Sequence, residues 1–191
     1  MLRSDAKHNR MLLLDAACHL IAQVGTDEIS AREIADRAGV SSATLYRHFP
    51  SKQALVDGIS VDRWHRMSEW ARGSRSPRSA IFDITLVLDR FSRLVSDDAE
   101  FIQAAGLKVG RTPVAIAPVR EVFDSRFDEL WNAARASGVV RRWAEPRDAV
   151  ELVGSIRSNE RRTPMLATII GGFVAPQVDV ERLLRTVRQP H

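Results

Sequence analysis

Residues 30–52 have the sequence SAREIADRAGVSSATLYRHFPSK, which predicts two short helices joined by a tight turn. Ser30 and Glu33 have the spacing of a capping box, in which each side chain bonds a backbone N–H of the other residue. Gly39 follows an apolar stretch that includes Ile34, and glycine readily adopts the left-handed backbone that ends a helix. The first helix is therefore expected between Ser30 and Gly39.

Ser41 is placed to cap a second short helix, expected from Ser42 to His48. Leu45 and Phe49 are four residues apart, so both are expected on its inward face. The side chains left to point outward are Ser42, Ala43, Tyr46 and Arg47. The first two are small, which lets the N-terminal end of such a helix approach base edges in the major groove. These features predict a helix-turn-helix that docks on duplex DNA.

Pro50 breaks the chain before a third helix, which Ser51 is expected to cap and Lys52 to begin. Free backbone N–H groups and the helix dipole favour an anion at such a start. A backbone phosphate is the anion expected there. Apolar residues continue at helical spacing from Leu55, which predicts that this helix runs to about Ala71.

The distribution of charge suits a polyanionic partner. The chain has 28 Lys and Arg against 24 Asp and Glu, a formal net charge of +4. No acidic residue lies between Asp36 and Asp57, so a local positive patch is expected from Arg37, Arg47, His48 and Lys52. The rest of the surplus is expected on solvated faces and subunit contacts, with a second nucleic-acid surface as the alternative. It comprises Arg141, Arg142, Arg157, Arg161, Arg162, Arg182, Arg185 and Arg188.

The stretch from Asn9 to Ile59 resembles the DNA-binding domain of the tetracycline-repressor (TetR) family of bacterial regulators. Ile34–Ser41 resembles that family's second helix and turn, and Thr44–Lys52 resembles its signature. Thr26 departs from the pattern, because the family usually has an aromatic residue there. The residues that resemble the family's first helix are Leu13, Leu14, Asp15, Ala16, Ala17, Leu20, Ile21, Ala22 and Gly25.

The resemblance implies DNA-binding roles for individual residues, with Ser41 as part of the same contact surface. The positions able to face bases would be Arg32, Ser42, Ala43, Tyr46 and Arg47. The positions that hold phosphates would be Thr44, His48 and Lys52. The residue types agree, because arginine can pair bidentately with guanine, serine can bond several bases and a small apolar side chain can touch a thymine methyl group.

Helical periodicity continues to the end of the sequence without a convincing strand. The segment 73–77 is expected to be a linker, and helices are expected around 81–95, through Phe101 and Leu107, and around 119–134, 150–156, 166–173 and 180–187. Gly138 is expected to end a helix, Pro146 to start one, and Thr163-Pro164 to cap and open another. The predicted fold is all-α, with a helix-turn-helix domain over 1–52, a connecting helix over 53–72 and a helical domain over 73–191.

For the helical domain, the resemblance implies an effector pocket and a homodimer interface. Two-fold symmetry would place two reading helices about 34–36 Å apart, one turn of DNA. The helices at about 146–160 and 163–175 are expected at the interface, although core packing explains their apolar residues nearly as well. The pocket is expected to be apolar and aromatic, with ordinary core packing as the alternative for each residue. Its candidates are Trp64, Met67, Phe82, Leu86, Phe91, Phe101, Phe123, Phe127 and Trp131.

These features predict a sequence-specific DNA-binding transcriptional regulator, a repressor released from a palindromic operator by a small apolar or amphipathic ligand. The alternative is a helical interaction or scaffold protein that retains the helix-turn-helix without binding DNA.

No enzymatic activity, cofactor or metal site is expected. The sequence has no phosphate-cradling glycine loop and no metal-ligand spacing, and its five histidines are scattered. The single cysteine, Cys18, excludes an internal disulfide and is expected to be a small, partly buried residue. The longest apolar run, Met165–Ala175, is too short to span a bilayer and no signal peptide is recognised, so a cytoplasmic location without a membrane partner is expected.

Overall fold

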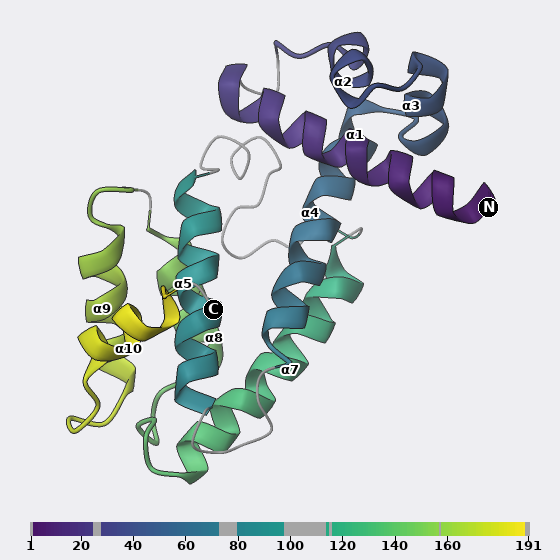
Figure 1. Cartoon of the computed structure of the whole chain (residues 1–191). Helices are drawn as coiled ribbons and strands as arrows, with labels where there is room; N and C mark the ends of the chain where they lie inside the picture. Colours follow the sequence, from purple (N-terminus) through teal and green to yellow (C-terminus); the bar gives the residue numbers. More distant parts are fainter. Residues whose placement is uncertain are drawn as a thin grey trace. The chain divides into compact units, whose positions relative to one another are not determined.

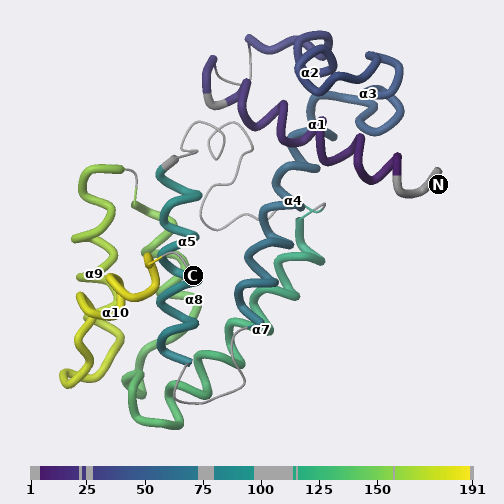
Figure 2. Tube along the Cα trace, viewed as in Figure 1, coloured from purple at the N-terminus to yellow at the C-terminus, as the bar shows by residue number. Residues whose placement is uncertain are grey.

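The computed structural model describes residues 2–24, 28–72, 80–97, 114, 116–156 and 158–189. The regular structure of these residues is helical, with one isolated antiparallel bridge between Val140 and Val174 (Figure 1; Figure 2). The predicted all-α class is confirmed. The helices are α1 (Leu2–Val24), α2 (Ala31–Ala38), α3 (Ser42–His48), α4 (Lys52–Trp70), α5 (Ala80–Asp97), α7 (Ala117–Ala136), α8 (Pro146–Gly154), α9 (Arg162–Phe173) and α10 (Val180–Val187).

The chain divides into two compact units, and the boundary falls inside α4, between Arg63 and Trp64. The predicted linker at 73–77, the segment through Phe101 and Leu107, Thr26 and Arg157 lie outside the described residues.

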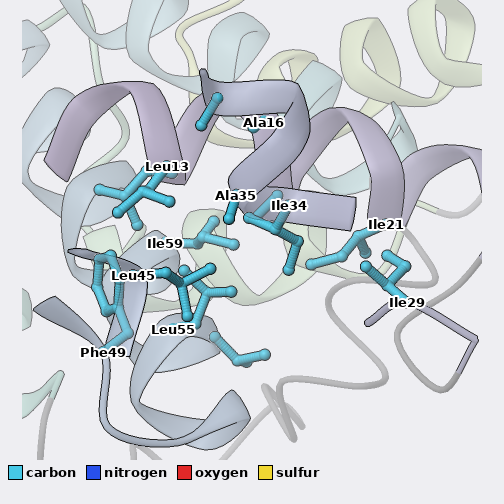
Figure 3. Close-up of a cluster of buried hydrophobic side chains, with 14 residues drawn as sticks. Leu13, Ala16, Ile21, Ile29, Ile34, Ala35, Leu45, Phe49, Leu55 and Ile59 are labelled. Carbon is cyan, nitrogen blue, oxygen red and sulfur yellow. The ribbon is translucent and has the colours of Figure 1, made fainter. Parts of the chain in front are cut away.

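The first unit packs α1, α2, α3 and the beginning of α4 around one apolar core (Figure 3). Each helix contributes residues at helical spacing, and full burial of one large aliphatic or aromatic side chain contributes roughly 1.5–3 kcal/mol. Cys18 is half-buried at the edge of this core, as predicted, and Arg63 Nη2 lies 3.9 Å from its Sγ. The central core residues are Leu13, Ala17, Ile21, Ile34, Ala35, Leu45, Phe49, Leu55 and Ile59.

The second unit is built around α5, which contacts α7, α8, α9 and α10 (Figure 1). Phe123, Phe127 and Trp131 recur at four-residue intervals on α7, so their rings lie one above the other along the helix. The buried indole of Trp131 donates its Nε1–H to the Ala144 carbonyl at 3.0 Å, which satisfies its polar atom.

Two helix boundaries in this unit were predicted correctly and one was wrong. Gly138 follows α7 in the left-handed conformation, with φ 75°, and Pro146 is the first residue of α8. Thr163 does not cap α9, because the helix already begins at Arg162. Its hydroxyl instead accepts a hydrogen bond from Arg188 Nη1 at 3.0 Å, so a long-range partner replaces the local role.

The expectation that all C-terminal arginines are solvated or at subunit contacts is wrong for Arg162 and Arg188. Both side chains are largely buried and bond the carboxylate of Asp89 on α5, whose side chain is only 3% exposed. Arg93 completes the group, 3.0 Å from Asp89 Oδ2. A buried carboxylate is costly unless cations and donors surround it, and these arginines supply both.

None of the described helices combines the length and apolar character required to cross a membrane.

Candidate nucleic-acid interface

The capping box at the start of α2 has the predicted geometry. Glu33 Oε2 accepts from the Ser30 backbone N–H at 2.8 Å and from its hydroxyl at 2.7 Å, while Ser30 Oγ accepts from the Glu33 N–H at 3.1 Å. The hydrogen bond from the Ser30 backbone, followed by that from its hydroxyl, holds the pKa of Glu33 below its ordinary value. The ionised carboxylate is thus the form that fixes the start of α2.

The turn between α2 and α3 depends on Gly39, whose φ of 68° is in the left-handed region. Its N–H bonds the Asp36 carbonyl, and the N–H of Val40 bonds the Ala35 carbonyl at 3.0 Å. These bonds satisfy carbonyls that the end of α2 would leave without partners. Glycine is the residue that adopts this backbone without strain.

The helix α3 begins at the predicted cap. Ser41 Oγ accepts from the Thr44 N–H at 3.1 Å and lies 2.9 Å from the Thr44 hydroxyl. Leu45 is 3% exposed, and Phe49, whose N–H closes the helix on the Leu45 carbonyl at 2.8 Å, is 2% exposed. The opposite face is open to solvent, whereas Thr44 and His48 are half-buried beside it. The exposed residues are Ser41, Ser42, Ala43, Tyr46 and Arg47.

The start of α4 lies next along the chain. Ser51 Oγ accepts from the Ala54 N–H at 3.1 Å, so the serine caps the helix as predicted. Lys52 is exposed at the first helical position, where other backbone donors remain open to an anion. Gln53 Nε2 donates a hydrogen bond to Asp57 Oδ1 at 2.8 Å. Asp57 is the first acidic residue after Asp36 in the sequence.

Two of the predicted cations differ in their surroundings. Arg32 makes an ion pair with Asp36, with Nε 3.7 Å from Oδ2 and both side chains largely exposed. Such a surface pair contributes little to stability, so the arginine can exchange the carboxylate for another anion. Arg47 forms no ion pair with a carboxylate among the described residues. Its positive charge is therefore not neutralised within that part of the chain.

Most of the predicted pocket residues lie in the core of the second unit. Phe91, Trp64, Phe123, Phe127 and Trp131 form a continuous row with ring centroids 5.3–6.1 Å apart. Met67 is buried in the same unit, Phe82 and Leu86 are half-buried, and Phe101 lies outside the described residues. The guanidinium of Arg120 lies 4.4 Å from the Trp64 ring centroid and 5.8 Å from the Phe123 ring centroid, which places a cation beside this apolar row.

The sequence interpretation missed one residue beside α3, namely Arg10. Its guanidinium carbon lies 4.5 Å from the centroid of the Phe49 ring. The signal was present in the pattern, because Arg10 precedes the buried Leu14 by one helical turn and a cation on a core-facing stripe is unusual. Among the described residues, no group of histidine, cysteine or acidic side chains is arranged to hold a metal ion.

Comparisons of sequence and of structure both find similarity to TetR-family regulators. Residues 13–59 match the family model described as bacterial regulatory proteins, tetR family. A crystal structure of the TetR transcription regulatory protein from Mycobacterium vanbaalenii is 30% identical in sequence, with a TM-score of 0.70 over 92% of this chain and 100% of that one.

Two curated relatives match over shorter stretches. The HTH-type transcriptional repressor KstR of Rhodococcus jostii is 31% identical over 99 residues, which are 51% of this chain and 46% of that protein. The class D tetracycline repressor protein of Escherichia coli is 37% identical over 57 residues, 30% of this chain and 26% of the repressor. The chain thus spans less than half the length of these curated relatives.

Proposed function

Because the chain belongs to the TetR family of bacterial regulatory proteins, we propose that it is a DNA-binding transcriptional regulator whose α3 reads an operator in the major groove. The observation that carries this proposal is the two-sided character of α3. Its inner face is anchored by Leu45 and Phe49, and its outer face presents small and polar side chains to solvent. A rigid support with an open polar face is what base recognition by a helix requires.

Base contacts come from the exposed side of this unit. Arg47 and Arg32 can each present a bidentate guanidinium fork to guanine, while Ser42 and Tyr46 supply hydroxyl groups. Ala43 offers a methyl group that can touch the methyl of thymine. The small side chains at 42 and 43 lie in the first turn of α3, so they let its N-terminal end come close to the bases.

Phosphate contacts frame the base contacts and set the register of the protein on the duplex. Lys52 and the capped start of α4 combine a positive charge with open backbone donors. Thr44 and His48 flank the reading face, and Ser41 orders the start of α3 beside them. The absence of acidic residues between Asp36 and Asp57 keeps this surface attractive to the DNA backbone.

The regulator acts as a homodimer on a palindromic operator, because one three-helix head makes few contacts and a symmetric pair doubles them. The apolar helices α8 and α9 form the subunit interface in this proposal. A small apolar or amphipathic ligand of the second unit releases the protein from DNA. It does so by binding the released conformation more tightly than the DNA-bound one. The aromatic row from Phe91 to Trp131 supports such a ligand class.

Enrichment of duplexes from a random pool on the purified chain tests the proposal. A palindromic winner with half-sites about one turn apart, bound with a steep dependence on salt, is the expected result. Equal recovery of all duplexes would contradict sequence-specific binding. It would favour the alternative, a helical scaffold protein that retains the motif without reading DNA.

A further inference from the structure

We propose that Arg10, on α1, binds a backbone phosphate of the DNA in addition to the contacts made by α3 and α4. The inference rests on the proposed DNA-binding function and enlarges its site. It assigns a ligand, a phosphodiester oxygen, to a side chain that lies outside the helix-turn-helix itself.

Arg10 is held against the end of the reading helix. Its guanidinium carbon lies 4.5 Å from the centroid of Phe49, the residue that closes α3, in the range of a cation–π contact. Phe49 is fixed by burial in the core of the same unit. The position of the guanidinium is therefore tied to the position of α3.

Gly58 on α4 makes room for this arrangement. A Cβ atom at Gly58 would lie 2.6 Å from Phe49 Cε1 and 3.3 Å from Arg10 Nη2, so a side chain there would collide with the ring and crowd the guanidinium. Three segments of the unit, α1, the end of α3 and α4, thus meet at Arg10. Such a preorganised arginine loses less side-chain freedom when it binds an anion than a freely rotating surface arginine does.

Arg10 has no anionic partner in the described part of the chain. Its one described interaction is the contact with the Phe49 ring, and no carboxylate or other acceptor engages its N–H groups there. Asp57, which precedes Gly58 on α4, accepts a hydrogen bond from Gln53. A partly buried guanidinium with unused donors is suited to a phosphate, because its planar fork matches two phosphate oxygens.

The surroundings of Arg10 extend the positive surface toward the N-terminal end of α1. Lys7 lies one turn earlier on the same helix and is exposed. Both residues precede position 13, where the match to the family model begins. Figure 1 shows the N-terminal half of α1 passing beside α3 within the first unit. The proposal places the backbone of a duplex read by α3 beside this part of α1.

The test compares the salt dependence of duplex binding for wild type, Arg10→Met and Arg10→Lys, with Arg142→Met as the matched control. Methionine keeps an apolar stem over Phe49 but removes the charge, whereas lysine keeps the charge. Arg142 is an exposed arginine of the second unit without a described ion pair. The duplex is the one enriched from the random pool, with its scrambled sequence alongside.

If Arg10 holds a phosphate, Arg10→Met lowers the slope of log K against log salt by about 0.9 and weakens the enriched and scrambled duplexes by the same factor. Arg10→Lys and Arg142→Met keep the wild-type slope. A merely structural arginine would change the melting temperature but not the slope, and that result overturns this inference alone. If Arg10→Met does not fold, Arg10→Gln takes its place. A wild-type chain that binds no duplex overturns the proposed function, and this inference with it.

Discussion

Arg188, just after α10, places its Nη2 2.6 Å from Oδ1 of Asp89, a buried carboxylate on α5, and its Nε 2.9 Å from the same oxygen. Arg162 Nη1, at the start of α9, lies 3.3 Å from that oxygen and 3.1 Å from the Ser92 hydroxyl. One carboxylate thus fastens both C-terminal helices to the centre of the second unit.

Asp89→Ala is expected to lower the free energy of unfolding by about 3 kcal/mol, because it leaves arginines largely buried without their anion. Urea unfolding followed by circular dichroism measures the change. Glu181→Ala is the control, since Glu181 pairs with Arg185 where both side chains are mostly exposed, and such a pair contributes little. Equal stability of the two variants would contradict the structural role of Asp89.

The contribution of Asp89 depends on pH in a defined direction. Burial acts to raise the pKa of this carboxyl, but the hydrogen bond and charge of Arg188, together with those of Arg93, outweigh burial and hold the pKa below its ordinary value. A depressed folded-state pKa means that the stabilisation is present above the unfolded-state pKa, about 3.9, and is lost as the pH falls through the folded-state value.

The stability difference between wild type and Asp89→Asn is therefore expected to stay constant from pH 7 to 5 and to shrink below about pH 4. Urea midpoints measured across this range give the comparison. A difference that already declines between pH 7 and 5 would mean that the carboxyl titrates at a raised pKa.

The Asp89 group shows where sequence reasoning stops. Arg162 and Arg188 lie 73 and 99 positions from Asp89, and no local pattern says which arginine will meet a buried acid. The pair Thr163-Pro164 predicts a cap, but α9 already begins at Arg162 and the Thr163 hydroxyl accepts from Arg188 instead. The interior polar residues Thr85, Asp89 and Ser92 do share one face of α5, and their helical spacing is visible in the sequence.

Signals that act within a few residues were read correctly. The capping box, the left-handed Gly39, the Ser41 cap and the inward Leu45 and Phe49 each follow from local backbone chemistry. The contact of Arg10 with Phe49 was not foreseen, because it joins α1 to the end of α3 across the folded unit. The roles of individual residues on DNA remain predictions.

Ser30→Ala is expected to lower the stability of the first unit by about 1 kcal/mol, since it removes the cap of α2. Thermal unfolding of the full chain checks the loss. Ser42→Ala is the matched control, because Ser42 lies in the first turn of α3 with an exposed side chain and no described cap bond. If the two variants lose equal stability, the capping box does not set the start of α2.

Arg47→Ala and Lys52→Ala are expected to weaken DNA binding in different ways. Loss of a base contact at Arg47 costs about 1–3 kcal/mol on the preferred duplex and relaxes the choice of one base pair. Loss of a phosphate contact at Lys52 weakens all duplexes alike and lowers the salt slope by about one unit. Titrations on matched and single-mismatch duplexes separate the two effects, and identical profiles would show that one role is misassigned.

The central claim is that α3 reads sequence, and the ratio of affinities for the enriched duplex and its scrambled counterpart at one physiological salt concentration tests it most directly. We expect the enriched duplex to bind at least about 1,000-fold more tightly, the lower end of specific recognition. A ratio near one, with Arg47→Ala indistinguishable from wild type, would contradict the claim.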